Sequence, residues 1–260
     1  MAGSVRIDRE GALAWLVFDH EARRNAITAE MWQAIPDLAR ELDEDDSVRV
    51  VVMRGAGEVA FVSGADISEF EESRTGDAAA AYDVRNDTAF AALAAIRKPV
   101  LAMVHGFCIG GGCAISLTAD MRFAAEDALF GIPAARLGLG YQASGLETLA
   151  RTVGFPAAKE IFFTARRFNV DEALQMGLVN RVFAKAELEG AVREIAESIA
   201  ENAPLTLRAA KVAFAEVSKA VPERDTDAIS EALGRCFGSE DYAEGVRAFL
   251  EKRRPKFKGH

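Results

Sequence analysis

The chain has 260 residues, of which 50% are hydrophobic and 27% charged, enough apolar material for one large domain or for a domain with a small appendage. The formal net charge of −9 argues against nucleic acid as a partner, although the basic ending EKRRPKFKGH could meet an anionic ligand locally. No apolar stretch approaches the roughly 20 residues of a membrane span, and the first ten residues lack the apolar core of a signal peptide, so we expect a cytoplasmic protein that does not contact membranes.

The first half of the chain predicts a repeated order of strand, strand and helix. In chain order, we expect strands at 4–8 and 13–19, a helix at 28–45, a strand at 48–55, a turn with a short helix at 61–70, a helix at 78–96, a strand at 98–106, a helix at 111–119 and two short strands within 121–131. Thr28 is suited to cap the first helix. This order differs from the simple alternation of strands and helices in a dinucleotide-binding sheet.

The second half of the chain is predicted to be mostly helical. Helices are expected at 144–153, 156–164, 187–201, 204–218, 226–237 and 239–253. We therefore expect an α/β fold with a core of ββα units over 1–186 and a helical region over 187–260. Because no Gly/Ser-rich linker separates the two, we expect them to pack together.

Three consecutive glycines in HGFCIGGGCA, residues 105–114, stand where a strand ends and a helix begins. Bare backbone at that place can present N–H donors to a phosphate, a carboxylate or a developing oxyanion. A P-loop would need Lys followed by Ser or Thr, whereas Cys113 and Ala114 follow here. A dinucleotide fingerprint would follow the first strand, which this segment does not. Close packing of helix on strand without any ligand is the alternative that remains beside an oxyanion hole.

An oxyanion hole needs two convergent donors, and a second glycine-containing turn is available to supply one of them. It is SGADI, Ser63–Ile67, which also follows a predicted strand. The two turns together are a more specific signal than either one alone.

The chain resembles the enoyl-CoA hydratase/isomerase (crotonase) superfamily over nearly its whole length. The matching segments are RRNAI at 23–27, FVSGADI at 61–67, KPVLAMVHGFCIGGGC at 98–113, residues 119–133, TARRFNVDEALQMGLVNRV at 164–182 and the ending AFLEKRRPKF. The resemblance implies a ClpP-like spiral of ββα turns with a helical C-terminal trimerisation region, assembled as a homotrimer or a hexamer made of two trimers.

The resemblance also assigns roles to residues. It implies that the amides of Ala65 and Gly111 form the oxyanion hole for the thioester carbonyl of an acyl-CoA. Coenzyme A contacts are implied at Ala22, Arg23, Arg24, Ala65, Asp66 and Ile67, and at Phe249 and Lys252, which in relatives reach the coenzyme A of a neighbouring subunit. Coenzyme A enters as part of the substrate, and no prosthetic group or metal is expected because the few histidines and cysteines form no ligand cluster.

Two acidic residues of the family's hydratases are missing from this chain. The resemblance places them at positions 114 and 134, and both are alanine here. Alanine cannot hold water or carry a proton, and each lost acid–base group ordinarily costs about 10²–10⁴-fold in rate. Tyr141 matches a tyrosine of methylmalonyl-CoA decarboxylase-like members, so we expect a lyase that decarboxylates a short 2-carboxyacyl-CoA. The alternatives are an enoyl-CoA hydratase or isomerase of fatty-acid and acyl-CoA metabolism with substituted acid–base residues, and a non-catalytic acyl-CoA-binding protein.

Five further residues are weaker candidates. Gln142 and Ser144 lie in the same segment as Tyr141, and Glu69 follows SGADI, where it faces either the pocket or solvent. His105 is interpreted as a packing histidine at a strand end. Cys113 is interpreted as a small helix residue, since nothing near it in sequence would activate a thiol.

Overall fold

The computed structural model describes residues 3–69 and 77–260, so the last residue of the turn and short helix expected at 61–70 lies outside the described residues. Its strands form two sheets. The larger sheet has the order β1-β2-β3-β5-β7-β10, in which β1 and β2 are antiparallel and the other neighbours are parallel. Its strands are β1 (Ser4–Glu10), β2 (Leu13–Asp19), β3 (Val50–Gly55), β5 (Val100–Val104), β7 (Met121–Ala125) and β10 (Arg181–Phe183).

The smaller sheet has the order β4-β6-β8-β9. Its strands are β4 (Ala60–Val62), β6 (Phe107–Ile109), β8 (Leu129–Gly131) and β9 (Phe168–Asn169). The pairs β3/β4, β5/β6 and β7/β8 each give one strand to each sheet and are each followed by a helix, so the chain spirals through three ββα turns. The ββα core expected from the sequence is therefore confirmed.

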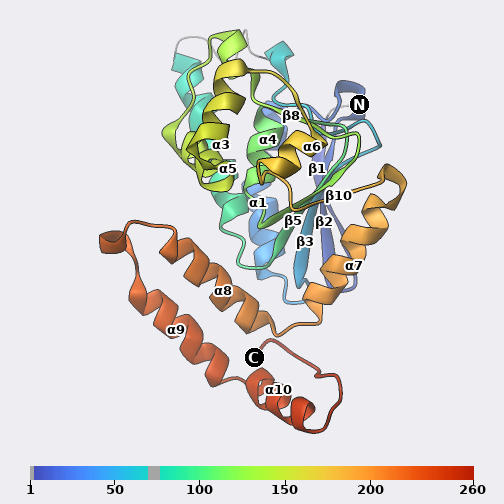
Figure 1. The fold of residues 1–260 in the computed structure, drawn as a ribbon, viewed down its shortest axis with the longest axis vertical. Coiled ribbons are helices and arrows are strands. Elements are labelled where there is room, and N and C mark those ends of the chain that lie inside the picture. Colours follow the sequence, from blue (N-terminus) through green and yellow to red (C-terminus); the bar gives the residue numbers. More distant parts are fainter. Residues whose placement is uncertain (1–2, 70–76) are drawn as a thin grey trace.

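The helices cover the sheets and extend beyond them (Figure 1). They are α1 (Ala29–Glu44), α3 (Asp77–Ala94), α4 (Gly111–Leu117), α5 (Ala143–Thr164), α6 (Val170–Gln175), α7 (Leu188–Ala200), α8 (Pro204–Val217), α9 (Thr226–Phe237) and α10 (Glu240–Leu250). Short 3-10 segments are η1 (Glu21–Arg23), η2 (Ile67–Glu69), η3 (Pro133–Leu137), η4 (Lys185–Glu187) and η5 (Val221–Glu223). No helix in the described ranges is long and apolar enough to cross a bilayer.

The first helix shows how local sequence sets an element in place. The hydroxyl of Thr28 accepts a hydrogen bond from the Met31 amide at 3.3 Å, which confirms the expected N-cap. The Glu69 carboxylate accepts another from the Ala29 amide at 2.8 Å, so this side chain ties η2 to the start of α1. The buried residues of α1 recur at helical spacing and face the sheet: Met31, Trp32, Ile35, Ala39 and Leu42.

Helix α5 is bent where the sequence predicts a break between two helices. Gly154 has φ 77° and ψ 156° inside the helix, and Pro156 follows two residues later. A positive φ suits glycine, and proline cannot continue the hydrogen-bond ladder of a helix, so α5 consists of the two expected helices joined at a kink.

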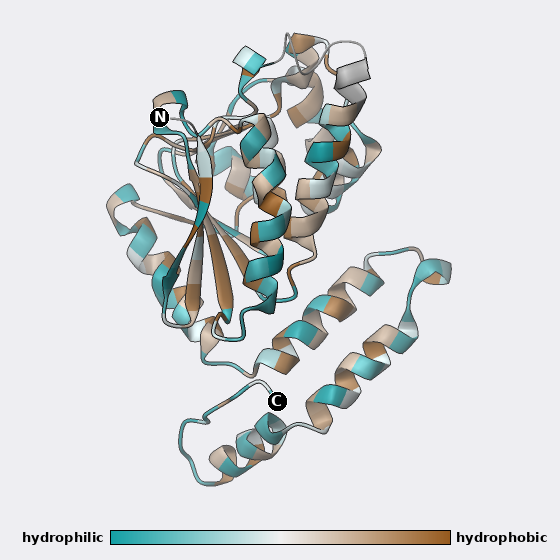
Figure 2. Ribbon diagram, turned by 180° about the vertical axis from the view of Figure 1, so that it is seen from behind, coloured by the Kyte–Doolittle hydropathy of each residue, from teal (hydrophilic) through white to brown (hydrophobic). Residues whose placement is uncertain are grey.

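Helix α7 belongs to the core by packing, although the expected boundary at 186/187 precedes it. Its buried residues Leu188, Val192 and Ala196 lie in one apolar cluster with residues of the large sheet such as Trp15 and Val52. Helices α8, α9 and α10 extend away from this core, with α8 and α9 side by side, and carry apolar as well as polar residues (Figures 1 and 2).

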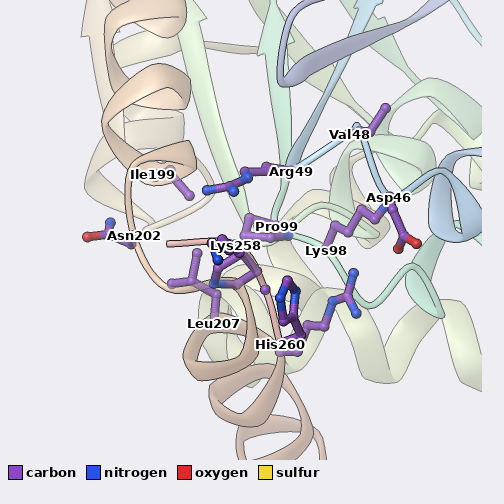
Figure 3. Close-up of a pocket in the computed structure, with 13 residues that line it drawn as sticks. Asp46, Val48, Arg49, Lys98, Pro99, Ile199, Asn202, Leu207, Lys258 and His260 are labelled. Atoms are coloured by element: carbon purple, nitrogen blue, oxygen red, sulfur yellow. The ribbon is translucent and has the colours of Figure 1, made fainter. Parts of the chain in front are cut away.

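The C-terminal tail is held to the core around a cavity of about 250 Å³ lined by several basic side chains (Figure 3). Arg49 donates to the carbonyl of Ala200 at 3.1 Å and to that of Phe257 at 2.5 Å. Lys98, 2% exposed, donates to the carbonyls of Leu42 and Asp45 at 2.7 and 2.5 Å. Because Arg49 and Lys98 already donate to backbone carbonyls, we interpret this cavity as part of the packing between the C-terminal tail and the core and not as a ligand site.

The glycine run is constrained by packing at Gly112. A β-carbon there would lie 2.0 Å from the carbonyl oxygen of Val62, so α4 rests directly on β4. We expect Gly112→Ala to lower the free energy of unfolding by at least about 1–3 kcal/mol, the usual cost of overpacking a core. Gly190→Ala in α7 is the matched control, since nothing lies within 4 Å of that β-carbon position, and it is expected to be neutral or stabilising by up to about 1 kcal/mol. Urea unfolding measures both, and equal stability of the two variants would contradict the packing argument.

Candidate active site

Two glycine turns meet at one edge of the small sheet. Strands β4 and β6 are parallel neighbours, so their carboxyl ends lie together. The chain leaves β4 through Gly64 at φ 118° and leaves β6 through Gly110 at φ 56°. A β-carbon on Gly110 would lie 4.0 Å from the Cα of Gly64, and one on Gly111 would lie 3.8 Å from the amide nitrogen of Ala65. The structure therefore brings together the two turns that the sequence singled out.

The amides of Ala65 and Gly111 differ from those of their neighbours. Ile27 donates to Gly64 at 2.8 Å, Asp66 donates to Ile27 at 2.9 Å, and Gly110 donates to Gly131 at 2.8 Å. Within the described ranges, neither Ala65 N–H nor Gly111 N–H has a backbone acceptor. Gly111 is the first residue of α4, where an N–H group has no acceptor inside the helix. Two donors with free hydrogen-bonding capacity thus stand side by side.

Ala65 and Gly111 line a cavity of about 580 Å³. Its walls come from the two turns, from α1, α3 and α4, and from η3 with the following loop and the start of α5. Helices α3, α4 and α5 gather at the end of the molecule away from α8–α10 (Figure 1). The size suits a small acyl group with part of its carrier.

Trp32 forms the wall behind Gly111. Its Cζ2 lies 3.3 Å from the place where a β-carbon on Gly111 would stand, and its ring meets that of Phe90 edge-on at 5.2 Å between centroids. Because Trp32 is only 1% exposed, its position is fixed by the core of α1. The sequence analysis treated this residue only as part of an amphipathic helix.

Ala114, Ala134 and Tyr141 all line the cavity. Tyr141 is half-buried, and its ring packs edge-on against Phe162 at 5.4 Å between centroids. The same ring covers Gly145, where a β-carbon would lie 2.8 Å from Cε1 of Tyr141. The two alanines at the positions where the resemblance places the acids of the family's hydratases therefore line the same cavity as Tyr141.

The sequence analysis missed a row of residues on α3. Asp83, Asn86, Asp87 and Phe90 all line the cavity. Their spacing of i, i+3, i+4 and i+7 marks one helix face. This signal is present in the stretch DVRNDTAF, for which the sequence analysis predicts only a helix. Asp83 and Asp87 are the charged residues among the described ones that line the cavity, so its wall is acidic.

Asp87 is perturbed by this position. Asp87 is an exposed residue, but the protein around its carboxyl partly removes that group from water. This desolvation raises the pKa of Asp87 above the ordinary value, and the nearby carboxylate of Asp83 raises it further. A raised pKa means that the group accepts a proton more readily than an aspartate in water does.

The segment expected to contact coenzyme A lies next to the first glycine turn. Ser63 donates to the carbonyl of Arg23 from its hydroxyl at 3.2 Å and to that of Arg24 from its amide at 3.1 Å. Ala22, Arg23 and Arg24 are exposed, and the Arg24 guanidinium stacks over the Phe107 ring at 4.9 Å. Exposed arginines beside the cavity mouth suit a phosphate-bearing carrier.

The other expected coenzyme A contacts are divided between two places. Ile67 is exposed and lines the cavity, while Asp66 is 8% exposed and accepts from the Ser68 amide and hydroxyl at 3.0 and 2.7 Å. Phe249 and Lys252 belong to α10 and the turn after it, and neither lines the cavity of its own chain. Their expected contact with the coenzyme A of a neighbouring subunit stays a prediction.

The weaker candidates separate into lining and structural residues. Gln142 and Ser144 are exposed and line the cavity, whereas Glu69 accepts from α1 as described above. Cys113 is fully buried, as is Cys108, whose thiol pKa is raised well above its usual range by that burial. No group of His, Cys, Asp and Glu side chains in the part of the chain that the structure describes is arranged to hold a metal ion.

His105 lies outside the cavity lining and is 4% exposed. Its Nε2 has no hydrogen-bond partner among the described residues. Burial lowers its pKa to about 4, with Arg54 and Lys185 acting in the same direction and Asp127 and Glu58 opposing them. These surroundings fit the packing interpretation.

Comparison with known proteins agrees with this geometry. A family model described as Enoyl-CoA hydratase/isomerase matches residues 8–260. A short-chain-enoyl-CoA hydratase of Clostridium acetobutylicum is 36% identical over 251 residues, covering 96% of each chain, and a carnitinyl-CoA dehydratase of Proteus mirabilis is 32% identical over the full length of both. A crystal structure from Magnetospirillum magneticum, described as an enoyl-CoA hydratase/carnithine racemase, superposes with a TM-score of 0.94 at 34% identity, covering 98% of this chain and 96% of that one.

The chain belongs to the enoyl-CoA hydratase/isomerase family and has the crotonase fold. It is therefore an enzyme of a family that processes acyl-CoA thioesters. The relatives named here are hydratases and dehydratases, which favours the hydratase alternative of the sequence analysis over decarboxylation.

The buried state of His105 has a consequence for stability in acid. Its pKa is about 4 when folded and 6.5 in its ordinary state, so the unfolded chain binds the extra proton first as the pH falls. The contribution of the neutral His105 ring to the free energy of unfolding is therefore fully present above pH 6.5, and it is lost as the pH falls toward 4. We expect wild type to lose on the order of 2–3 kcal/mol more than His105→Gln between pH 7 and 4.5, measured by urea unfolding at both values. Equal losses in the two proteins would refute this account, because they share every other titrating group.

Proposed function

We propose that this enzyme binds an acyl-CoA thioester with its carbonyl oxygen between the amides of Ala65 and Gly111, and that it adds water to, or removes it from, the double bond beside that carbonyl. The observation that carries the proposal is the pair of adjacent amides, without backbone acceptors in the described structure, at the wall of a cavity of about 580 Å³.

The chemistry follows from where negative charge gathers. When the oxygen of water bonds to the β-carbon of an enoyl thioester, the electrons of the double bond move toward the carbonyl oxygen and form an enolate. Two fixed N–H donors stabilise that oxygen, and one such donor is ordinarily worth about 3–4 kcal/mol in the transition state. Protonation of the α-carbon then completes the addition, and dehydration follows the same steps in reverse.

The charge of the cavity favours this reaction over decarboxylation. A 2-carboxyacyl thioester would bring its own carboxylate toward Asp83 and Asp87, with no cationic side chain among the described lining residues to offset the repulsion. The names of the relatives point in the same direction. In this proposal Tyr141 is a hydrogen-bonding wall of the acyl pocket.

We propose that residues beside the cavity bind the carrier part of the substrate. We assign the coenzyme A phosphates to the exposed Arg23 and Arg24, and the chain next to the thioester to Asp66 and Ile67 beside the first turn. Phe249, 83% exposed on α10, and Lys252 are assigned to the coenzyme A of a second subunit. Assembly of three or six copies would also cover other exposed apolar side chains of the C-terminal helices: Phe214, Phe237 and Leu250.

The reaction is tested with a panel of thioesters followed by mass spectrometry. We expect a gain of one water on crotonyl-CoA or on a longer or substituted enoyl-CoA, and no loss of carbon dioxide from methylmalonyl-CoA. Rapid decarboxylation of methylmalonyl-CoA would contradict this proposal and support the decarboxylase predicted from Tyr141. Tight binding of coenzyme A with no turnover of any thioester would favour a non-catalytic binding protein.

The oxyanion hole is tested with two substitutions of Gly111. Both add side-chain atoms, but only one of them removes the N–H donor. Gly111→Pro deletes the N–H at the first position of α4, where proline is compatible with a helix, and Gly111→Ala adds a β-carbon but keeps the N–H. We expect Gly111→Pro to have a kcat about 10²–10³-fold below that of Gly111→Ala, with both proteins folded by circular dichroism. A similar kcat for the two variants would remove the Gly111 amide from the mechanism.

A further inference from the structure

We infer that Asp87, paired with Asp83 on α3, is the proton-transfer group of the hydration or dehydration step, an inference that rests on the proposed function. It gives a role to a helix that the sequence analysis left without one, and it supplies the acid–base chemistry that positions 114 and 134 cannot.

The first argument is elimination among the residues that line the cavity. Ala114 and Ala134 carry no ionisable group. The ionisable side chains among the described lining residues are Tyr82, Tyr141, Asp83 and Asp87. A phenol ordinarily keeps its proton at neutral pH, so the two carboxyl groups are the ones suited to exchange a proton during turnover.

The second argument is the path from α3 to the oxyanion hole. Asp87 precedes Phe90 by three residues, which places both on one face of the helix roughly 5–6 Å apart. The Phe90 ring meets Trp32 at 5.2 Å, and Trp32 packs over Gly111. Asp87 is thus one helical turn from the wall that supports the second amide, whereas Asp83 lies a further turn away.

The third argument is the electrostatic state of the pair. Asp87 has no hydrogen bond or ion pair with any described residue, and Asp83 stands one turn before it with a like charge. Partial desolvation and that like charge raise the pKa of Asp87, so its carboxyl accepts a proton more readily than an ordinary aspartate does. The neighbouring Asn86 Oδ1 is buried without a hydrogen-bond partner in the described structure, so this part of the α3 face holds an unsatisfied acceptor beside Asp87.

The proton balance of the step is simple. Water gives hydroxide to the β-carbon and its remaining proton to the Asp87 carboxylate, while the double-bond electrons move to the thioester oxygen. The protonated Asp87 then gives this proton to the α-carbon as the enolate collapses, so its carboxylate ends in its starting state. One water is consumed, and no oxidant, reductant or co-reactant is needed.

The test uses the full-length enzyme with whichever enoyl-CoA wild type hydrates. We expect Asp87→Asn to lower kcat at least about 100-fold while KM changes less than about threefold, and Asp87→Glu to recover part of the loss because it restores a carboxylate. Asp83→Asn should shift the acid limb of the wild-type pH–kcat profile to lower pH, since it removes the like charge that raises the pKa of Asp87. Asp37→Asn, an exposed helical carboxylate paired with Arg40 outside the cavity, is the matched control and should match wild type.

Independent measurements keep the outcomes distinct. Coenzyme A affinity by calorimetry should be the same in wild type and Asp87→Asn, and exchange of the α-hydrogen of the product thioester with D₂O should be lost in the variant. If wild type turns over no enoyl-CoA, the proposed function fails. If wild type is active and Asp87→Asn keeps its kcat, the inference fails alone. A variant that keeps kcat on neutral enoyl-CoA and loses only a preference for acyl groups with an ammonium substituent would likewise overturn it, and would show that the carboxylates select the substrate.

Discussion

The contact of Gly112 with the carbonyl oxygen of Val62 is the constraint on which the site depends. Helix α4 can begin directly on top of β4 only because no β-carbon intervenes. This contact, together with the parallel pairing of β4 and β6, sets the turn after each strand beside the other. The bridge between Ile27 and Ala65 fastens the first turn to the start of α1 from the opposite side. The positions of the Ala65 and Gly111 amides are therefore consequences of backbone packing, and the donors need no rearrangement when a carbonyl oxygen arrives.

Around these two amides, some of the residues that line the cavity are buried in the core and others are exposed. Trp32 and the two turns belong to the buried core, whereas Asp87, Gln142 and Ser144 are exposed on α3 and on the segment before and within α5. The aromatic contacts Trp32–Phe90 and Tyr141–Phe162 connect the two kinds of wall. In the proposed mechanism the core part stabilises charge on oxygen, and the outer part exchanges protons and receives the acyl chain. In that mechanism the acid–base group stands on α3, so alanines at 114 and 134 are compatible with hydration by a member of the enoyl-CoA hydratase/isomerase family.

The sequence was sufficient for much of the fold because its local signals agree with its packing. The cap at Thr28, the break at Gly154 and the apolar strands β3 and β5 form as expected, whereas the short strands β4 and β6 that directly precede the glycine turns were not predicted. Of the two interpretations of the glycine run, close packing applies at Gly112, and the oxyanion hole stays a prediction. Gly64 and Gly110 adopt the positive φ that their turns require. The acidic face of α3 was missed because alanines dominate that helix, and a helix face becomes a cavity wall only through its tertiary neighbours. Trp32 was missed for the same reason. The placement of α7 on the large sheet depends on contacts between residues far apart in sequence.

The packing at Gly112 also limits how this scaffold can diversify. A change that moved either glycine turn would have to displace the backbone of β4 or α4, so the donors are costly to alter. Helix α3 and the loop from Leu137 to Gln142 meet no such obstacle, because Gly138 and Gly140 have open space around them and the aspartates project from a helix surface. Side chains there can be exchanged one at a time without moving the Ala65 and Gly111 amides, so in the proposed mechanism the acyl group could change while the two donors stay in place.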